Sequence, residues 1–196
     1  YLLFRGNWRE RLGDIEPKPD QGFCYILNSQ ITSIPSMGVD ERCVADALEV
    51  CPIGVLLARG IGERLSRFSG AALIIDYASA HPGLSFQAVR AHSSVNPLIS
   101  PGESDLSCAV DFEVLGQAAR VAGARVHGPV PQGSFLSSLG IEQRATTLIK
   151  EANPEMACVV LQSKNRLIEP EFMGQLFNAL AISSPDIPLV EGFDIK

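Results

Sequence analysis

Two residues that can do chemistry follow an apolar run in residues 70–83, which read GAALIIDYASAHPG. The run stops at Asp76 and Tyr77, and a loop with Pro82 and Gly83 follows. Ligands of open α/β sheets sit outside the carboxyl ends of the strands. A carboxylate there can accept hydrogen bonds from a cationic substrate, and a phenol can stack or donate. The structural alternative is that Asp76 caps the loop.

A second acidic segment, residues 101–112, reads PGESDLSCAVDF and carries Glu103, Asp105 and Asp111. Carboxylates gathered in one loop can bind a guanidinium or ammonium group through charge-assisted hydrogen bonds. From residue types alone, a solvated loop followed by an ordinary helix cap at Asp111 is the favoured interpretation, because a run of charges usually faces solvent.

Other catalytic patterns are missing from the sequence. The histidines at 81, 92 and 127 have no metal-ligand spacing, and no metal site is predicted. No Gly-x-Ser-x-Gly elbow supports a hydrolase. Gly60 and Gly62 resemble half of a nucleotide fingerprint, but they lie inside a predicted helix rather than after a strand. The scattered cysteines predict reduced, mostly buried thiols of an intracellular protein, with one nucleophilic cysteine as the alternative.

Composition narrows the class of protein. The 196 residues are 46% hydrophobic and 19% charged, as expected of a globular domain with a real core. A net charge of -6 argues against a nucleic-acid partner, which would need a basic face. No apolar run is long enough to predict a membrane span.

The period of the apolar residues predicts the elements that position the acidic groups. Residues 1–42 form a predicted segment rich in β-hairpins, with a turn at Gly6-Asn7, a strand at 22–27 and a loop at 28–42. Residues 47–50 look extended. A helix with apolar positions at helical spacing starts at Pro52 and ends at Gly70.

The remaining residues, from 71 onward, alternate between strands and helices. The segment 71–76 has the continuous apolar run of a parallel strand that is buried on both faces. Helices are predicted at 110–122, 140–150 and 155–168, and strands at 124–130 and 173–183. This order predicts an α/β fold with a largely parallel sheet over residues 43–196.

Four segments occur in order along the chain: GAALIIDY, PGESDLSCAVDF, VHGPVPQGSFLSSLGI and MGQLFNAL. Together they resemble the MidA-like family of class I S-adenosylmethionine-dependent methyltransferases, and WRERL and LEVCP also look like family segments. The resemblance covers nearly the whole chain. The family includes the mitochondrial complex I assembly factor that methylates an arginine of a complex I subunit.

The resemblance implies that the chain is the C-terminal part of the Rossmann-like methyltransferase sheet, with a β-rich N-terminal insertion. The glycine-rich cofactor motif of the family, the acidic residue for the cofactor ribose and the motif that ends the fourth strand do not occur in the sequence. By resemblance, 70–76 is the fifth strand, 124–130 the sixth and 175–183 the seventh. The family's Asp-Tyr-Gly is here Asp-Tyr-Ala, with Ala78 in place of glycine.

The implied chemistry is methyl transfer from S-adenosylmethionine to an arginine of a protein substrate. This reaction needs the guanidinium aligned with the methyl group, which carboxylates can do. The expected site residues are Glu49 and Asp76 as catalytic groups and, as substrate-binding groups, Tyr77, Gly102, Glu103 and Asp105. The cofactor-binding residues stay unknown, so the chain alone is expected to be inactive.

Two further interpretations stay open. The chain can instead belong to a catalytically inactive assembly or binding factor with the same fold; an unrelated α/β hydrolase has little support. A homodimer is expected because a sheet without its first strands exposes an edge. The predicted compartment is the bacterial cytoplasm, with the mitochondrial matrix as the alternative, since the cysteine usage suits both.

Overall fold

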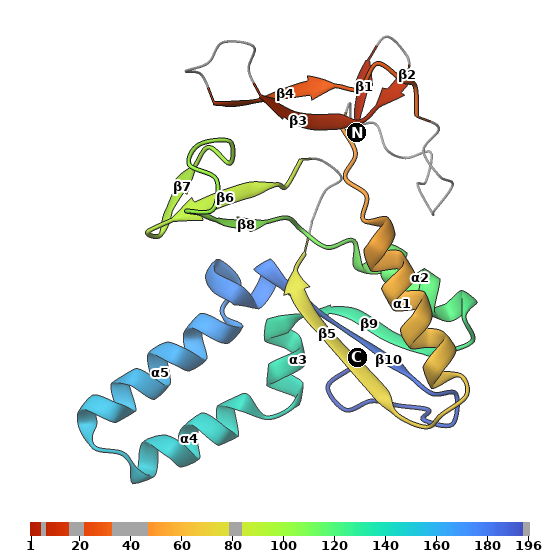
Figure 1. Ribbon diagram of the computed structural model, residues 1–196. Helices are drawn as coiled ribbons and strands as arrows, with labels where there is room; N and C mark the ends of the chain where they lie inside the picture. Colours follow the sequence, from red (N-terminus) through yellow and green to blue (C-terminus); the bar gives the residue numbers. More distant parts are fainter. Residues whose placement is uncertain (5–6, 16–21, 33–46, 79–83, 194–196) are drawn as a thin grey trace. The chain divides into compact units, whose positions relative to one another are not determined.

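The computed structural model describes residues 1–4, 7–15, 22–32, 47–78 and 84–193 (Figure 1). The chain forms two compact units: Tyr1–Cys51 with Ser79–Ala109, and Pro52–Ala78 with Val110–Lys196. The boundary predicted at residue 42 between two segments stays a prediction. No helix among the residues described combines the length and apolar character needed to cross a membrane.

The first unit is built from short antiparallel strands. It contains the hairpins β1 (Leu2–Phe4) with β2 (Asn7–Arg9) and β3 (Arg11–Ile15) with β4 (Phe23–Leu27), and the sheet β7 (Ser93–Val95), β6 (Gln87–Arg90), β8 (Asp105–Ser107) in that order. Asn7 pairs with Phe4, so it lies in strand β2 and not in the turn predicted at Gly6-Asn7. Of the extended segment predicted at 47–50, only Ala47 forms a bridge, with Leu2.

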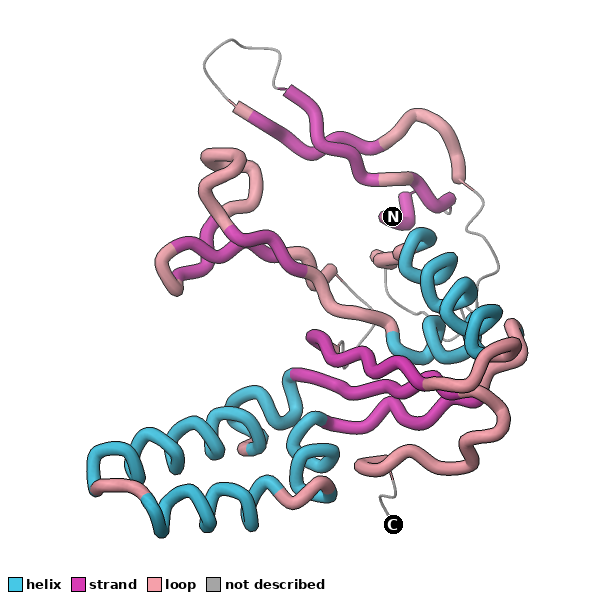
Figure 2. The backbone as a smooth tube through the Cα atoms, turned by 60° about the horizontal axis from the view of Figure 1, so that its bottom comes forward, coloured by secondary structure: helices cyan, strands magenta, loops and turns pink. Residues whose placement is uncertain are grey.

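The second unit holds a three-stranded sheet and the helices. Its strands are ordered β5 (Ala71–Tyr77), β10 (Phe177–Ser183), β9 (Arg125–Pro131), and its first two helices are α1 (Pro52–Leu65) and α2 (Phe112–Val121). Between β9 and β10 the chain forms α3 (Gln132–Ser138), α4 (Ile141–Glu151), α5 (Pro154–Ile168) and the turn η1 (Pro170–Gly174). Helices α4 and α5 lie side by side and extend away from the sheet (Figure 2).

Local chemistry explains where the predicted helices begin. Asp111 caps α2, since its Oδ1 accepts a hydrogen bond from the Val114 N–H at 3.1 Å. Asn153 caps α5 in the same way, with a 2.8 Å bond from the Met156 N–H, and Pro154 occupies the first turn. The sequence did not predict α3, because its segment QGSFLSS combines glycine with serines, which are weak helix formers.

The sheet of the second unit is antiparallel, which corrects the prediction of a largely parallel sheet. Strand β10 runs opposite to both β5 and β9 and lies between them. The reason is that the chain leaves β9 and enters β10 at the same end of the sheet, where Asn178 lies opposite Pro131. The parallel pairing in the described residues is an isolated bridge between Ala78 and Val110.

The core of the second unit lies between one sheet face and helices α1 and α2. Its buried members are Leu65, Phe112, Ala119, Ala124, Leu180 and Ile182. Strand β5 contributes Ala72 and Ile74 to this face, but Leu73 and Ile75 are 52% and 40% exposed. The prediction that this strand is buried on both faces is therefore wrong for the described residues, because successive side chains point to opposite faces and α1 and α2 cover one.

Asp186 joins the loop after β10 to the loop before β5, since its Oδ2 accepts a 2.9 Å hydrogen bond from the Ser69 hydroxyl. Hydrogen bonds from Ser184 and Ser69 hold the pKa of Asp186 below its ordinary value of 3.8. A depressed pKa stabilises the fold above the ordinary pKa, and this contribution is lost as the pH falls through the folded value. We expect Asp186→Asn to lower the thermal midpoint at neutral pH, and the difference to shrink below pH 3.8. A difference that stays constant as the solution is acidified would contradict this assignment.

Candidate functional site

Asp76 and Tyr77 lie where the sequence places them, at the carboxyl end of β5. The Ala78 N–H donates to the Leu176 carbonyl of the neighbouring chain segment. Because backbone groups of an antiparallel strand point to its two sides alternately, the N–H and carbonyl of the preceding residue, Tyr77, point away from β10. The Tyr77 N–H on this outer edge donates to Asp76 Oδ1 at 2.7 Å, and the Tyr77 carbonyl accepts from the Val110 N–H at 2.8 Å. Asp76 therefore caps the strand edge, as the structural alternative expects, and its exposed carboxylate retains a second oxygen for a ligand.

The end of β5 is built together with its neighbour β10. The ring of Tyr77 packs against Phe177, with 4.3 Å between ring centroids, and both residues are half-buried. Asn178 is the cross-strand partner of Asp76 on one side and of Pro131 on the other. This end of the sheet therefore presents a carboxylate and an amide on one face and an aromatic pair on the other, all from the two adjacent strands β5 and β10.

Glu49 ties together three segments of the first unit. Its carboxylate accepts hydrogen bonds from the Ser85 N–H at 2.9 Å, the Phe86 N–H at 3.1 Å and the Ser85 hydroxyl. The Ser85 oxygen in turn accepts a bond from the Ala109 N–H at 2.8 Å. Both carboxylate oxygens are thus occupied by the protein itself, which supports a positioning role for Glu49. The expected catalytic role stays a prediction.

The variant Glu49→Gln separates these two roles. A glutamine amide turns one acceptor into a donor that faces another donor, so we expect the free energy of unfolding to fall by about 1–3 kcal/mol. Glu103→Gln is the matched control, expected to change it by less than about 1 kcal/mol because its ion pair is exposed. Thermal unfolding of both variants measures this difference in stability. An unchanged midpoint for Glu49→Gln, with lost methylation in the full-length protein, would contradict the positioning role.

The three predicted substrate-binding residues of the acidic loop, Gly102, Glu103 and Asp105, differ in their surroundings. Glu103 forms a 2.9 Å ion pair with Arg90 of β6, and both side chains are largely exposed. Gly102 has φ of +86° in the turn before β8, a conformation that favours glycine. Asp105 opens β8 opposite Val89 and is exposed. Asp105 is thus exposed, whereas Glu103 is already paired; the substrate-binding role of both stays a prediction.

The predicted site residues fall in both units. Glu49, Gly102, Glu103 and Asp105 belong to the first, and Asp76 and Tyr77 belong to the second. In the first unit a cavity of about 280 Å³ is lined by Tyr1, Glu10, Arg11, Glu49, Val50, Leu84, Phe86 and Cys108. Among the residues that the structure describes, no three side chains of His, Cys, Asp or Glu gather as metal ligands.

Sequence reasoning missed several residues of these sites. Phe177 and Asn178 lie inside the quoted segment MGQLFNAL, so their position in a strand next to 71–76 was the available signal. Ser85 had no signal, because its role depends on Glu49, which lies 36 residues away in the chain. Arg90 likewise meets Glu103 only through strand pairing.

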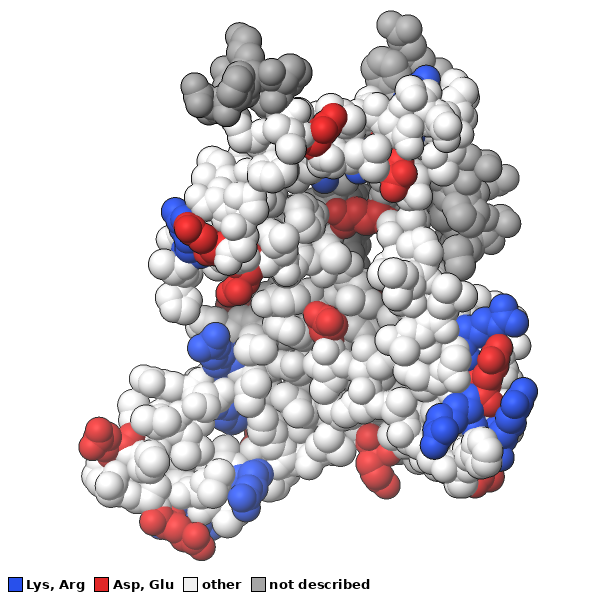
Figure 3. All heavy atoms as spheres, viewed as in Figure 1, with Lys and Arg blue, Asp and Glu red and all other residues white. Residues whose placement is uncertain are grey.

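Charged side chains on one face of the molecule are shown in Figure 3, where uncharged atoms cover most of the surface. Basic residues of the second unit gather on α1 and just after it. Arg59 pairs with Glu63 at 3.0 Å, and the Arg64 guanidinium lies 5.7 Å from the ring of Phe68.

The chain has the mixed α/β fold of two solved structures from Burkholderia thailandensis. They match with TM-scores of 0.71 and 0.72 at 22% and 21% identity, covering 99% of this chain and 52% and 50% of theirs. The second of these structures is bound to S-adenosyl-homocysteine. The fold is therefore shared with a protein that binds S-adenosyl-homocysteine, the product that methyl transfer from S-adenosylmethionine leaves behind.

The family follows from sequence comparison. A model of a family of S-adenosyl-L-methionine-dependent methyltransferases matches residues 2–130, and the chain belongs to this family. It is 31% identical over 182 residues to the protein arginine methyltransferase NDUFAF7, mitochondrial, of Xenopus laevis, covering 91% of this chain and 41% of the relative. The human protein of that name is 31% identical over 90% of this chain and 40% of its own length. The Drosophila melanogaster homologue is 34% identical over 92% and 43%.

The chain spans about 40% of the length of these relatives, as the coverage of the human protein shows. The family's cofactor is S-adenosylmethionine. In α1, Gly60 and Gly62 lie mid-helix, and the Gly133 backbone packs against the Ile168 carbonyl. The cofactor-binding residues therefore stay unassigned within the part of the chain that the structure describes.

Proposed function

We propose that this chain is the substrate-binding part of a protein arginine methyltransferase. The observation that carries the proposal is the exposed Asp76 carboxylate at the carboxyl end of β5, in a chain 31% identical to a protein arginine methyltransferase over 91% of its length. The cofactor would supply the methyl group. Residues of this chain would bind and orient the arginine.

The proposed role of each group follows from its chemistry. The outer oxygen of Asp76 accepts N–H bonds from the guanidinium and fixes its plane. The Tyr77–Phe177 ring pair, on the other face of the same strand end, is proposed to hold that end in shape. Asp105, in the first unit, is proposed as a further acceptor for the substrate. Glu49 is proposed to act through Ser85. It would hold the segment before β6 against the segment that follows β8.

A radiolabel assay tests this function. Full-length protein and S-adenosyl-[methyl-³H]methionine are incubated with an extract of cells that lack the protein, and methylated residues are identified after hydrolysis. We expect label in methylarginine, and in a subunit of respiratory complex I if the proposed assembly role holds. Label confined to lysine, nucleic acid or small molecules would contradict the proposal.

The isolated chain of 196 residues is expected to bind S-adenosylmethionine weakly or not at all, because no glycine-rich loop after a strand occurs in its sequence. Calorimetric titration of the isolated chain and of the full-length protein checks this. Micromolar affinity of the isolated chain would contradict the expectation and would reveal an unrecognised cofactor site in this chain.

A second candidate is an assembly or binding factor without activity. The filled hydrogen-bonding capacity of Glu49 favours it, because one of the two predicted catalytic carboxylates is engaged within the protein. An intact cofactor site in the full-length protein, seen by calorimetry, separates the enzyme from the factor. The names of the relatives support a mitochondrial location for either candidate.

A further inference from the structure

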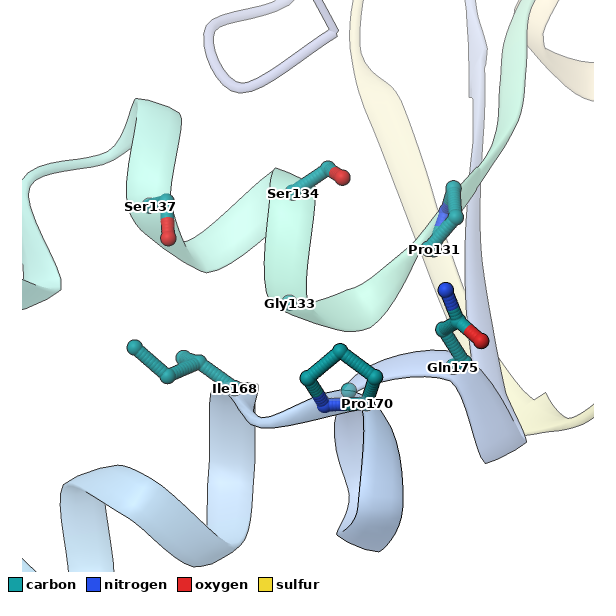
Figure 4. A pocket seen from close by; sticks show the side chains of 8 residues that line it. Pro131, Gly133, Ser134, Ser137, Ile168, Pro170 and Gln175 are labelled. Atoms are coloured by element: carbon teal, nitrogen blue, oxygen red, sulfur yellow. The ribbon is translucent and has the colours of Figure 1, made fainter.

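A second cavity lies in the second unit, where β9 ends. It has a volume of about 300 Å³ and is walled by α3 on one side and by the segment from the end of α5 through η1 on the other (Figure 4). The lining residues are Pro131, Gly133, Ser134, Ser137, Ile168, Pro170, Gly174 and Gln175. None of these lining residues is charged.

The walls of this cavity are held together by the protein itself. Gln132 is 5% exposed, and its Nε2 donates to the Leu167 carbonyl at 2.8 Å. Gly133 and Gly174 both approach the Ile168 carbonyl oxygen so closely that a Cβ on either would collide with it. The backbone of α3 is thus fixed against the end of α5, so the cavity keeps its shape without a ligand.

The cavity opens at the same end of the sheet as Asp76. Asn178 of β10 lies opposite Asp76 on one side and Pro131 on the other, so Asp76 and Pro131 are two strand spacings, about 10 Å, apart. Gln175 lies two residues before Phe177, whose ring packs on Tyr77. An extended peptide advances about 3.3 Å per residue, so about three residues bridge this distance.

The lining chemistry selects the kind of ligand. The cavity has no cation to hold a phosphate or carboxylate and no carboxylate to hold an amine. It offers proline and isoleucine surface together with the Ser134 hydroxyl and the Gln175 amide, which suit the backbone of an uncharged peptide. The Ser137 hydroxyl already donates to Glu142 Oε1 at 2.9 Å. Figure 4 shows the Gln175 amide near Pro131, and the Ser137 side chain pointing from α3 toward Ile168.

We propose that this cavity binds a short, extended and uncharged segment of the protein substrate, about three residues from the methylated arginine. The inference rests on the proposed function, because the arginine at Asp76 sets the reference point. It adds a specificity: substrates with small uncharged residues or proline near the arginine are preferred over those with charged residues there.

The test compares two probes in the full-length protein. One is N-acetyl-arginine-N-methylamide, which reaches only the Asp76 end, and the other is a set of seven-residue peptides with a central arginine flanked by alanine, serine and proline. Methyl transfer gives KM and kcat, and fluorescence anisotropy of labelled peptides gives binding without catalysis. We expect the peptides to have a KM about tenfold lower than the small probe.

Three variants assign this advantage to the cavity. Ser137→Trp fills it, and Gln175→Ala removes its amide without adding bulk. Ser163→Trp, on the exposed side of α5, is the matched control. We expect both cavity variants to raise the peptide KM by about tenfold, with little change in kcat or in the KM of the small probe. The control is expected to match the unmodified protein.

The outcomes are distinct. Unchanged peptide KM and binding in both cavity variants would overturn the inference and leave the proposed function intact. The same holds if the unmodified protein uses the small probe as well as the peptides. Failure of the unmodified protein to methylate arginine in any probe or in the cell extract would instead overturn the proposed function itself.

Discussion

Replacing Asp76 by asparagine in the full-length protein is expected to lower arginine methylation by about one to two orders of magnitude. A charge-assisted hydrogen bond is worth about 1.5–3 kcal/mol, and about 1.4 kcal/mol corresponds to tenfold. Asparagine keeps an oxygen that can accept from the Tyr77 N–H, so the cap of the strand edge survives. The loss is therefore assigned to the missing charge.

Asp111→Asn is the matched control for this measurement. Asparagine is as good a helix cap as aspartate, and Asp111 caps α2 without a proposed substrate contact. Cofactor affinity, thermal midpoint and methylation rate are measured on both variants. If Asp76→Asn turns over like the control, the carboxylate has no part in substrate binding and only its capping role remains.

The two glycines of α1 are expected to respond in opposite directions to alanine. A Cβ on Gly60 meets nothing within 4 Å, so alanine is expected to stabilise the helix by about 0.5–1 kcal/mol. A Cβ on Gly62 lies 2.9 Å from the Ala119 carbonyl oxygen and 2.9 Å from the Ala122 Cβ. We expect Gly62→Ala to force α1 from α2 and to cost about 1–3 kcal/mol.

Denaturant unfolding of the two variants measures this difference in free energy. Both substitutions replace glycine by alanine in the same helix, so the change in helix propensity is the same for both. The difference between their free energies of unfolding therefore reports the packing of α1 against α2. Equal stability of Gly60→Ala and Gly62→Ala would show that α1 and α2 do not pack as described. Of the two glycines that resembled half a nucleotide fingerprint, Gly62 thus has a packing explanation and Gly60 has none.

Much of the second unit could be predicted from local signals. The caps at Asp111 and Asn153 and the apolar spacing of α2 are properties of adjacent residues, and α2 and α5 form where the sequence indicates. The quoted segment GAALIIDY likewise gives β5 and the position of Asp76 at its end. Local rules suffice for these features because each depends on contacts within a few residues.

Other features depend on contacts between distant residues. The direction of β10 follows from where the chain returns after α5, and no pattern within 177–183 encodes it. A continuous apolar run is equally compatible with one or two covered faces, which is why the exposure of Leu73 and Ile75 was not foreseen. The engagement of Glu49 by Ser85 joins residues 36 positions apart.

The paired positions of Pro131 and Asn178 have a consequence for how proteins of this fold can diverge. Residues 132–176, which connect β9 to β10, begin and end at neighbouring points of the sheet. The strands therefore constrain only the two ends of this connecting segment. The free-energy cost of closing a loop rises by only about 0.6 kcal/mol for each doubling of its length. Insertions and deletions in the outer turns of α4 and α5 are therefore inexpensive, and this arm can change in length while the strand end that carries Asp76 is retained.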